Sequence, residues 1–128
     1  MKPTENWVEV GALTWFYRES LPANETERLP VVLLHGIPCQ SYGWREVMPA
    51  LADKGFRAIA PDWIGCGFSA QPDRRDFPYT SARFVQAFQE FLAALEISQC
   101  SLVVQGFLGT VGLQFALQHP EQVDRLVI

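Results

Sequence analysis

The stretch VVLLHGIP, residues 31–38, decides the fold class. Its first half is a run of β-branched and aliphatic residues without polar alternation, which is typical of a strand buried on both faces of a parallel sheet. Its second half contains glycine and proline, so the strand is expected to end at Leu34. The same apolar signature recurs at Phe56–Ala60, Ser101–Val104 and Arg125–Ile128. An antiparallel pair, Trp7–Val10 with Leu13–Glu19, is predicted to precede them.

Helical patterns separate these strands. Apolar residues recur with the 3.6-residue period of a helix in Ser81–Leu95, and shorter helices fit Trp44–Asp53 and Gly109–His119. Gly55 and Pro120 follow the shorter helices as stop signals. The alternation predicts an α/β fold with a mostly parallel sheet and flanking helices, in one continuous domain over residues 1–128.

Composition and charge exclude several classes of protein. The chain has 128 residues and a formal net charge of -4, so it offers no broad basic field for nucleic acid. No apolar run approaches the roughly 20 residues that span a bilayer, and no apolar signal segment follows the first residues. Three cysteines, an odd number with no zinc-ligand spacing, predict a reducing, cytoplasmic location and no metal site. No cofactor is expected.

Three loops follow the carboxyl ends of predicted strands, where parallel sheets place binding and catalytic groups. They contain HGIP at residues 35–38, PDWIGCGFS at 61–69 and QGFLG at 105–109. In this order they resemble the α/β-hydrolase superfamily, most closely its haloalkane dehalogenase and epoxide hydrolase branch. The Asp-x-x-Gly-x-Gly-x-Ser pattern of Asp62–Ser69 is the most specific part. The resemblance spans Val31–Ile128 and implies a relative of small-molecule hydrolases acting on esters, epoxides or alkyl halides.

The resemblance also implies a set of site residues. Backbone N–H groups of Ile37 and Phe107 map to the two donors of an oxyanion hole, which stabilises developing negative charge. Gly36 allows the sharp His-Gly turn that precedes Ile37. His35 and Asp62 are interpreted as residues that fix the site loops by hydrogen bonds, in preference to roles as acid or base.

Gly106 falls where the family places its nucleophile, on a turn between strand and helix. Glycine suits that backbone geometry but cannot attack a substrate. In the dehalogenase branch a Trp after the nucleophile and often an Asn after His-Gly hold the halide, whereas this chain has Phe107 and Ile37. Carbon–halogen cleavage is therefore not expected. Neither Thr110, placed in the next helix, nor His119, at that helix's far end, replaces the missing groups.

The catalytic acid and histidine of the family lie beyond the sixth strand, so a 128-residue chain is interpreted as a fragment, a truncated product or one half of a split protein. Its incomplete sheet edge predicts self-association. Two functional hypotheses stay open. The first is a parent protein that is a hydrolase, in which a water molecule or another side chain, such as Cys39 or Cys66, replaces the nucleophile. The second is a non-catalytic homologue that binds a small apolar molecule or a partner. A Rossmann nucleotide site is disfavoured because the glycine spacing does not match.

Overall fold

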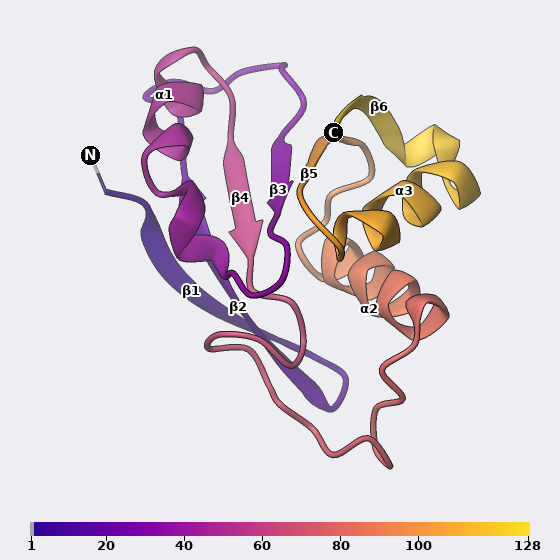
Figure 1. The fold of residues 1–128 in the computed structure, drawn as a ribbon. Helices are drawn as coiled ribbons and strands as arrows, with labels where there is room; N and C mark the ends of the chain where they lie inside the picture. The colour runs from indigo at the N-terminus through magenta and orange to yellow at the C-terminus, as the bar shows by residue number, and fades with distance from the viewer. Residues whose placement is uncertain (1) are drawn as a thin grey trace.

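The computed structural model describes residues 2–128, which form a six-stranded sheet in the order β1-β2-β4-β3-β5-β6 (Figure 1). Strand β2 runs antiparallel to both of its neighbours, β1 and β4, whereas β3, β4, β5 and β6 run parallel to one another. The strands are β1 (Thr4–Val10), β2 (Leu13–Ser20), β3 (Val31–Leu34), β4 (Ala58–Pro61), β5 (Cys100–Val104) and β6 (Val123–Val127). The helices are α1 (Val47–Asp53), α2 (Ser81–Ala94) and α3 (Gly109–Gln118), with 3-10 turns η1 (Ser41–Trp44) and η2 (Pro120–Gln122). The predicted α/β class is confirmed.

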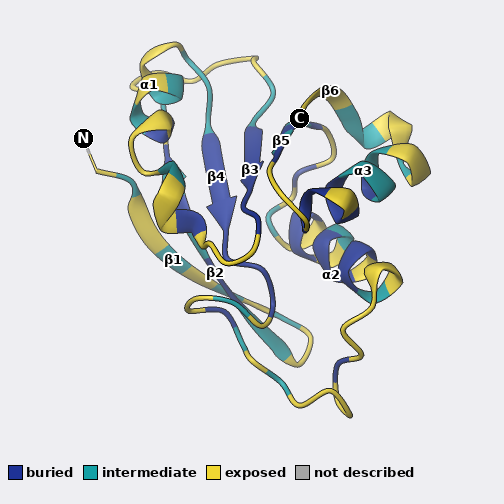
Figure 2. Ribbon diagram, in the orientation of Figure 1, coloured by how far each residue is buried: buried dark blue, intermediate teal, exposed yellow. Residues whose placement is uncertain are grey.

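Helices cover both faces of the sheet, and the residues of β3 show why its sequence lacks polar alternation. Val31 and Leu33 pack with Met48 of α1 on one face. Val32 and Leu34 belong to the larger cluster on the other face, which includes the aromatic side chains of α2 and α3. Figure 2 shows β3 and β4 buried along their whole length. Because β3 is buried on both faces, it holds the loop at its carboxyl end in a fixed position.

Some predicted boundaries were wrong. The helix expected over Trp44–Asp53 is divided: η1 ends at Trp44, and α1 begins only at Val47. The strand expected from Phe56 begins two residues later, because Gly55 turns the chain with φ +90° and hydrogen-bonds back to Ala52. The first two residues of the predicted strand therefore lie in the loop that precedes β4.

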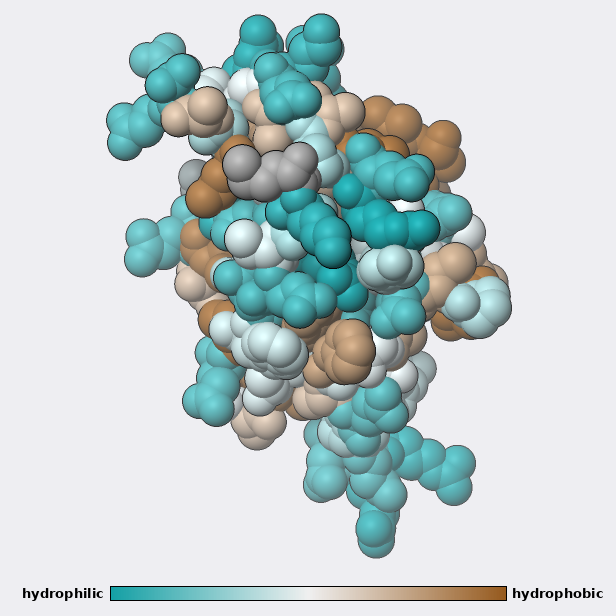
Figure 3. Space-filling model, turned by 90° about the vertical axis from the view of Figure 1, so that its left-hand side faces the viewer, coloured by the Kyte–Doolittle hydropathy of each residue, from teal (hydrophilic) through white to brown (hydrophobic). Residues whose placement is uncertain are grey.

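The strand predicted at Arg125–Ile128 lies at Val123–Val127, two residues earlier at its start. Strand β6 is paired only with β5 and lies at the sheet edge, so all its residues after Val123 are exposed. The apolar sequence of this segment marks an unpaired hydrophobic edge. On the opposite side of the molecule, around β1 and α1, hydrophilic residues cover most of the visible face (Figure 3). Among residues 2–128, no helix is both long and apolar enough to cross a bilayer.

Candidate functional site

The turn between β5 and α3 places Gly106 at the carboxyl edge of the sheet. Gly106 has a φ of +68°, in the left-handed region that side chains disfavour, and its carbonyl accepts a hydrogen bond from the N–H of Gly109 at 3.0 Å. A strained strand-to-helix turn is the geometry described for the nucleophile elbow of α/β-hydrolases. Thr110 lies in α3, and His119 is the C-cap residue of that helix. The hydroxyl of Thr110 donates to the carbonyl of Phe107 at 2.9 Å, so this side chain is bound to the turn, whereas His119 lies at the far end of the helix.

The loop after β3 packs directly against this turn. Leu34 and Val104 are neighbours in the parallel register, so the residues that follow them emerge side by side. A Cβ atom added to Gly36 would lie 2.9 Å from the carbonyl oxygen of Gln105, and one added to Gly106 would lie 3.2 Å from the Cα of Gly36. Two glycines are needed because the two backbones are in contact.

The predicted oxyanion-hole donors lie at this contact. A Cβ on Gly106 would be 4.0 Å from the backbone nitrogen of Ile37. The chain reverses at Ile37 and Pro38, where the N–H of Cys39 donates to the carbonyl of Gly36 at 3.0 Å. Within residues 2–128, neither the N–H of Ile37 nor that of Phe107 has a hydrogen-bond acceptor. Their side chains are 56% and 75% exposed, so the surface around the turn is apolar and open to a ligand.

His35 is buried and hydrogen-bonded on both ring nitrogens. Its Nδ1–H donates to the carbonyl of Gly36 at 2.8 Å, and its Nε2 accepts from the N–H of Trp63 at 3.1 Å. The indole N–H of Trp63 also donates to the His35 carbonyl. Burial lowers the pKa of His35, although the Gly36 hydrogen bond and Asp62 oppose this effect. These contacts are those of a neutral residue that ties two loops together.

Asp62 joins the same loops through its carboxylate, which is fully buried. Oδ1 accepts from the N–H of Ser41 at 2.7 Å, and Oδ2 accepts from the N–H of Phe68 at 2.9 Å. The carbonyl of Asp62 accepts from the hydroxyl of Ser69, whose oxygen in turn accepts from the N–H of Phe16. With both carboxylate oxygens engaged by backbone N–H groups, Asp62 fixes the shape of the loop.

The three cysteines are free, and they differ in environment. Cys39 is exposed, immediately after the turn that presents Ile37. Burial, with a contribution from Asp62, raises the pKa of the half-buried Cys66, and burial raises the pKa of Cys100 to about 12. Of the residues that the structure describes, no group of three or more His, Cys, Asp or Glu is arranged to hold a metal ion.

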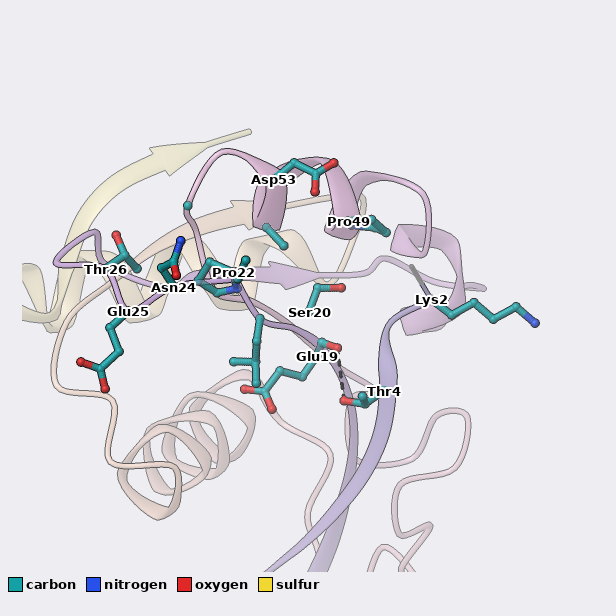
Figure 4. Close-up of a pocket in the computed structure, with 14 residues that line it drawn as sticks. Lys2, Thr4, Glu19, Ser20, Pro22, Asn24, Glu25, Thr26, Pro49 and Asp53 are labelled. Carbon is teal, nitrogen blue, oxygen red and sulfur yellow. Dashed lines mark hydrogen bonds between the residues drawn. The ribbon is translucent and has the colours of Figure 1, made fainter.

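A cavity of about 550 Å³ lies elsewhere, between the segment that follows β2 and helix α1 (Figure 4). Its lining includes Ser20, Pro22, Pro49 and Gly55. Ser20 is paired with Ala58, the first residue of β4, so this cavity opens at the amino edge of the parallel strands. It is separate from the glycine turn at the carboxyl edge.

Sequence reasoning missed Arg18, which the structure connects to the site loops. Arg18 is 8% exposed, and its Nε donates to the hydroxyl oxygen of Ser41 at 3.2 Å. The signal was present in β2, where Arg18 shares a strand face with the apolar Phe16 and with the small Ser20. A charge on a buried face of a strand indicates a paired, structured contact.

The family assignment follows from this geometry and from comparison with known proteins. A family model described as "alpha/beta hydrolase fold" matches residues 30–128. The chain therefore belongs to the α/β-hydrolase fold family, and the predicted resemblance is confirmed.

Individual relatives agree with this assignment. The chain is 37% identical over 106 residues to a cis-3-alkyl-4-alkyloxetan-2-one decarboxylase of Shewanella oneidensis, covering 82% of this chain and 33% of the relative. It is 39% identical over 99 residues to a haloalkane dehalogenase of Mycobacterium marinum, covering 77% of this chain and 33% of that protein. The chain thus spans about a third of the length of the curated relatives that it matches.

Solved structures show the same fold. An epoxide hydrolase from Vigna radiata superposes with a TM-score of 0.84 at 30% identity, covering 97% of this chain and 37% of that one. A loop variant of a haloalkane dehalogenase from Bradyrhizobium elkanii gives a TM-score of 0.86 at 29% identity, with 98% and 40% covered. The superposed part includes both glycine loops, because almost the whole chain is matched.

Proposed function

We propose that the chain provides a non-covalent binding site for a small apolar molecule bearing a carbonyl oxygen. The observation that carries the proposal is Gly106: it holds the turn of a nucleophile elbow with φ +68° but has no side chain to attack a ligand. The N–H groups of Ile37 and Phe107 have no acceptor in residues 2–128 and would bind the carbonyl oxygen. The exposed side chains of these two residues would contact the apolar part of the ligand.

The test is an amide-resolved NMR titration with butyramide, a carbonyl compound that does not acylate proteins. The amide signals of Ile37 and Phe107 are expected to shift, while those of Leu21 at the opposite edge stay fixed. Gly106→Ala should weaken binding because the added methyl group would lie 3.2 Å from the Cα of Gly36 and displace the loop that carries Ile37. Gly11→Ala is the matched control, since Gly11 also has a positive φ, +62°, but nothing lies within 4 Å of an added Cβ. Absence of any shift at Ile37 and Phe107 would exclude the proposed site.

A second candidate function, hydrolysis through a substitute nucleophile, is favoured by the position of Cys39 beside the turn. The raised pKa of Cys66 disfavours its thiolate at neutral pH. We expect no turnover of 4-nitrophenyl butyrate, styrene oxide or 1-bromobutane, and no covalent adduct by intact mass. Turnover that disappears in Cys39→Ser, together with an adduct that peptide mapping assigns to Cys39, would establish the hydrolase and overturn the non-covalent proposal.

A further inference from the structure

Arg18 is a buried charge at the centre of a network outside the glycine turn. Its Nη1 lies 3.0 Å from Oε2 of Glu5, and its Nε donates to the hydroxyl oxygen of Ser41 at 3.2 Å. The guanidinium carbon lies 5.1 Å from the ring centroid of Phe16 and 5.2 Å from that of Tyr42. An arginine is therefore held from three directions, by β1, by β2 and by η1.

The network continues from Ser41 into the site loops. The N–H of Ser41 donates to Oδ1 of Asp62, and Oδ2 of the same carboxylate accepts the N–H of Phe68. Ser41 itself is fully buried and begins η1, only four residues after Ile37. The hydroxyl and the backbone N–H of one serine thus link Arg18 to Asp62.

We infer that Arg18 is a positioning residue for the Ile37 N–H, acting through Ser41 and Asp62; this inference rests on the proposed binding site. The two ends of the segment 36–41 are both fixed. Gly36 is held against Gln105 and Gly106, and Ser41 is held by Arg18 and Asp62. Ile37 lies between these anchors, so the direction of its N–H depends on both.

Arginine suits this position better than lysine for a geometric reason. Its planar guanidinium presents donors in a fixed fork, so Nη1 can pair with Glu5 while Nε reaches Ser41. The guanidinium carbon also lies over aromatic rings. A lysine ammonium could keep the charge pair with Glu5 but would lose the defined second bond. Arg18→Lys therefore keeps the positive charge and removes the hydrogen bond to Ser41, so the two contributions can be measured apart.

The experiment compares Arg18→Lys with Arg57→Lys in the whole chain. Arg57 is the matched control because its Nε pairs with Glu19, also on β2, at the amino edge of the sheet and away from Ile37. Arg18→Lys is expected to move the amide signals of Ile37 and Phe68 without ligand and to weaken butyramide binding by about tenfold, the scale of one lost hydrogen bond. Arg57→Lys should leave both measurements unchanged.

A double-mutant cycle separates positioning from general destabilisation. Ser41→Ala removes the acceptor hydroxyl but keeps the N–H that binds Asp62, so its effect should not add to that of Arg18→Lys. Ser41→Ala with Arg57→Lys should be additive. If Arg18→Lys does not unfold cooperatively, the ligand-free amide signal of Ile37 is compared between Ser41→Ala and the wild type instead.

The outcomes distinguish the two proposals. Unchanged Ile37 and Phe68 signals in Arg18→Lys and Ser41→Ala, with butyramide still bound, would overturn the positioning role and leave the binding site intact. If wild-type protein does not bind butyramide, the proposed function fails. The ligand-free Ile37 signal then still decides the inference: displacement by both variants supports it, and no displacement overturns it.

Discussion

At the scale of single residues, the protonation state of His35 is set by its two hydrogen bonds. The N–H of Trp63 can only donate, so Nε2 of His35 must be an acceptor and the ring proton lies on Nδ1, facing the Gly36 carbonyl. Protonation of Nε2 would break the Trp63 contact and place a charge among buried groups. The neutral ring is therefore part of the folded structure.

This arrangement predicts a defined pH dependence of stability. Burial lowers the pKa of His35 below its unfolded value of about 6.5, so the unfolded chain binds a proton first as the pH falls. The free energy of unfolding should decrease from pH 6.5 downward, with a contribution of at most about 1.4 kcal/mol per pH unit, until the pH reaches the folded pKa. Urea denaturation at pH 7.5, 6.5 and 5.5 measures it.

Two variants assign the effect to His35. His35→Gln, which cannot take up a proton, should be less stable at pH 7.5 but should lose this part of the pH dependence. His119→Gln, changed at the half-exposed end of α3, should retain it. Equal slopes for His35→Gln and the wild type would show that His35 is not the group responsible.

At the scale of elements, the approach of α3 to β5 depends on Gly112. A Cβ added there would lie 2.5 Å from Cγ1 of Val104 and 3.3 Å from Cδ1 of Leu34. Val104 is β-branched and buried, so it cannot turn away cheaply. At Gly109 in the same helix, the nearest atom would be at 3.5 Å, an ordinary contact.

The two glycines should respond in opposite directions to alanine. Gly112→Ala is expected to destabilise the fold by about 1–3 kcal/mol through overpacking, despite the better helix propensity of alanine. Gly109→Ala should be neutral or stabilising by up to about 1 kcal/mol. Thermal unfolding followed by circular dichroism measures both, and a stabilised Gly112→Ala would contradict the close packing of α3 on β5.

The strands and loops also show how much of this fold can be predicted from the sequence. The apolar run of β3 and the glycine-rich turns predicted the sheet and the two loops that meet at Gly36 and Gly106, because local patterns reflect burial on two faces. The same apolar pattern predicted the strand β6 but not where it begins, since the ends of a strand depend on which neighbour pairs with it. Arg18 was missed for a related reason: its partners Glu5 and Ser41 are distant in sequence.

At the scale of the whole molecule, the two edges of the sheet differ in chemistry. The outer strand β1 presents Glu5 and Glu9 to solvent, and charged edge strands resist pairing with another chain. At the opposite edge, β6 and the residue that follows it expose Leu126, Val127 and Ile128 at 38%, 56% and 85%. An edge with free backbone groups and apolar side chains is a surface on which a further strand can pair.

We therefore predict that the 128-residue chain self-associates through β6. Light scattering coupled to size exclusion should give a mass that rises with protein concentration. Val127→Lys should shift the chain toward the monomer, because a charge on an edge strand opposes pairing. Leu21→Lys is the matched control, since Leu21 is 64% exposed but follows β2 at the far side of the sheet. A wild-type mass that stays monomeric at all concentrations would rule out the β6 interface, and equal dissociation by both lysine variants would assign the association to general surface hydrophobicity instead.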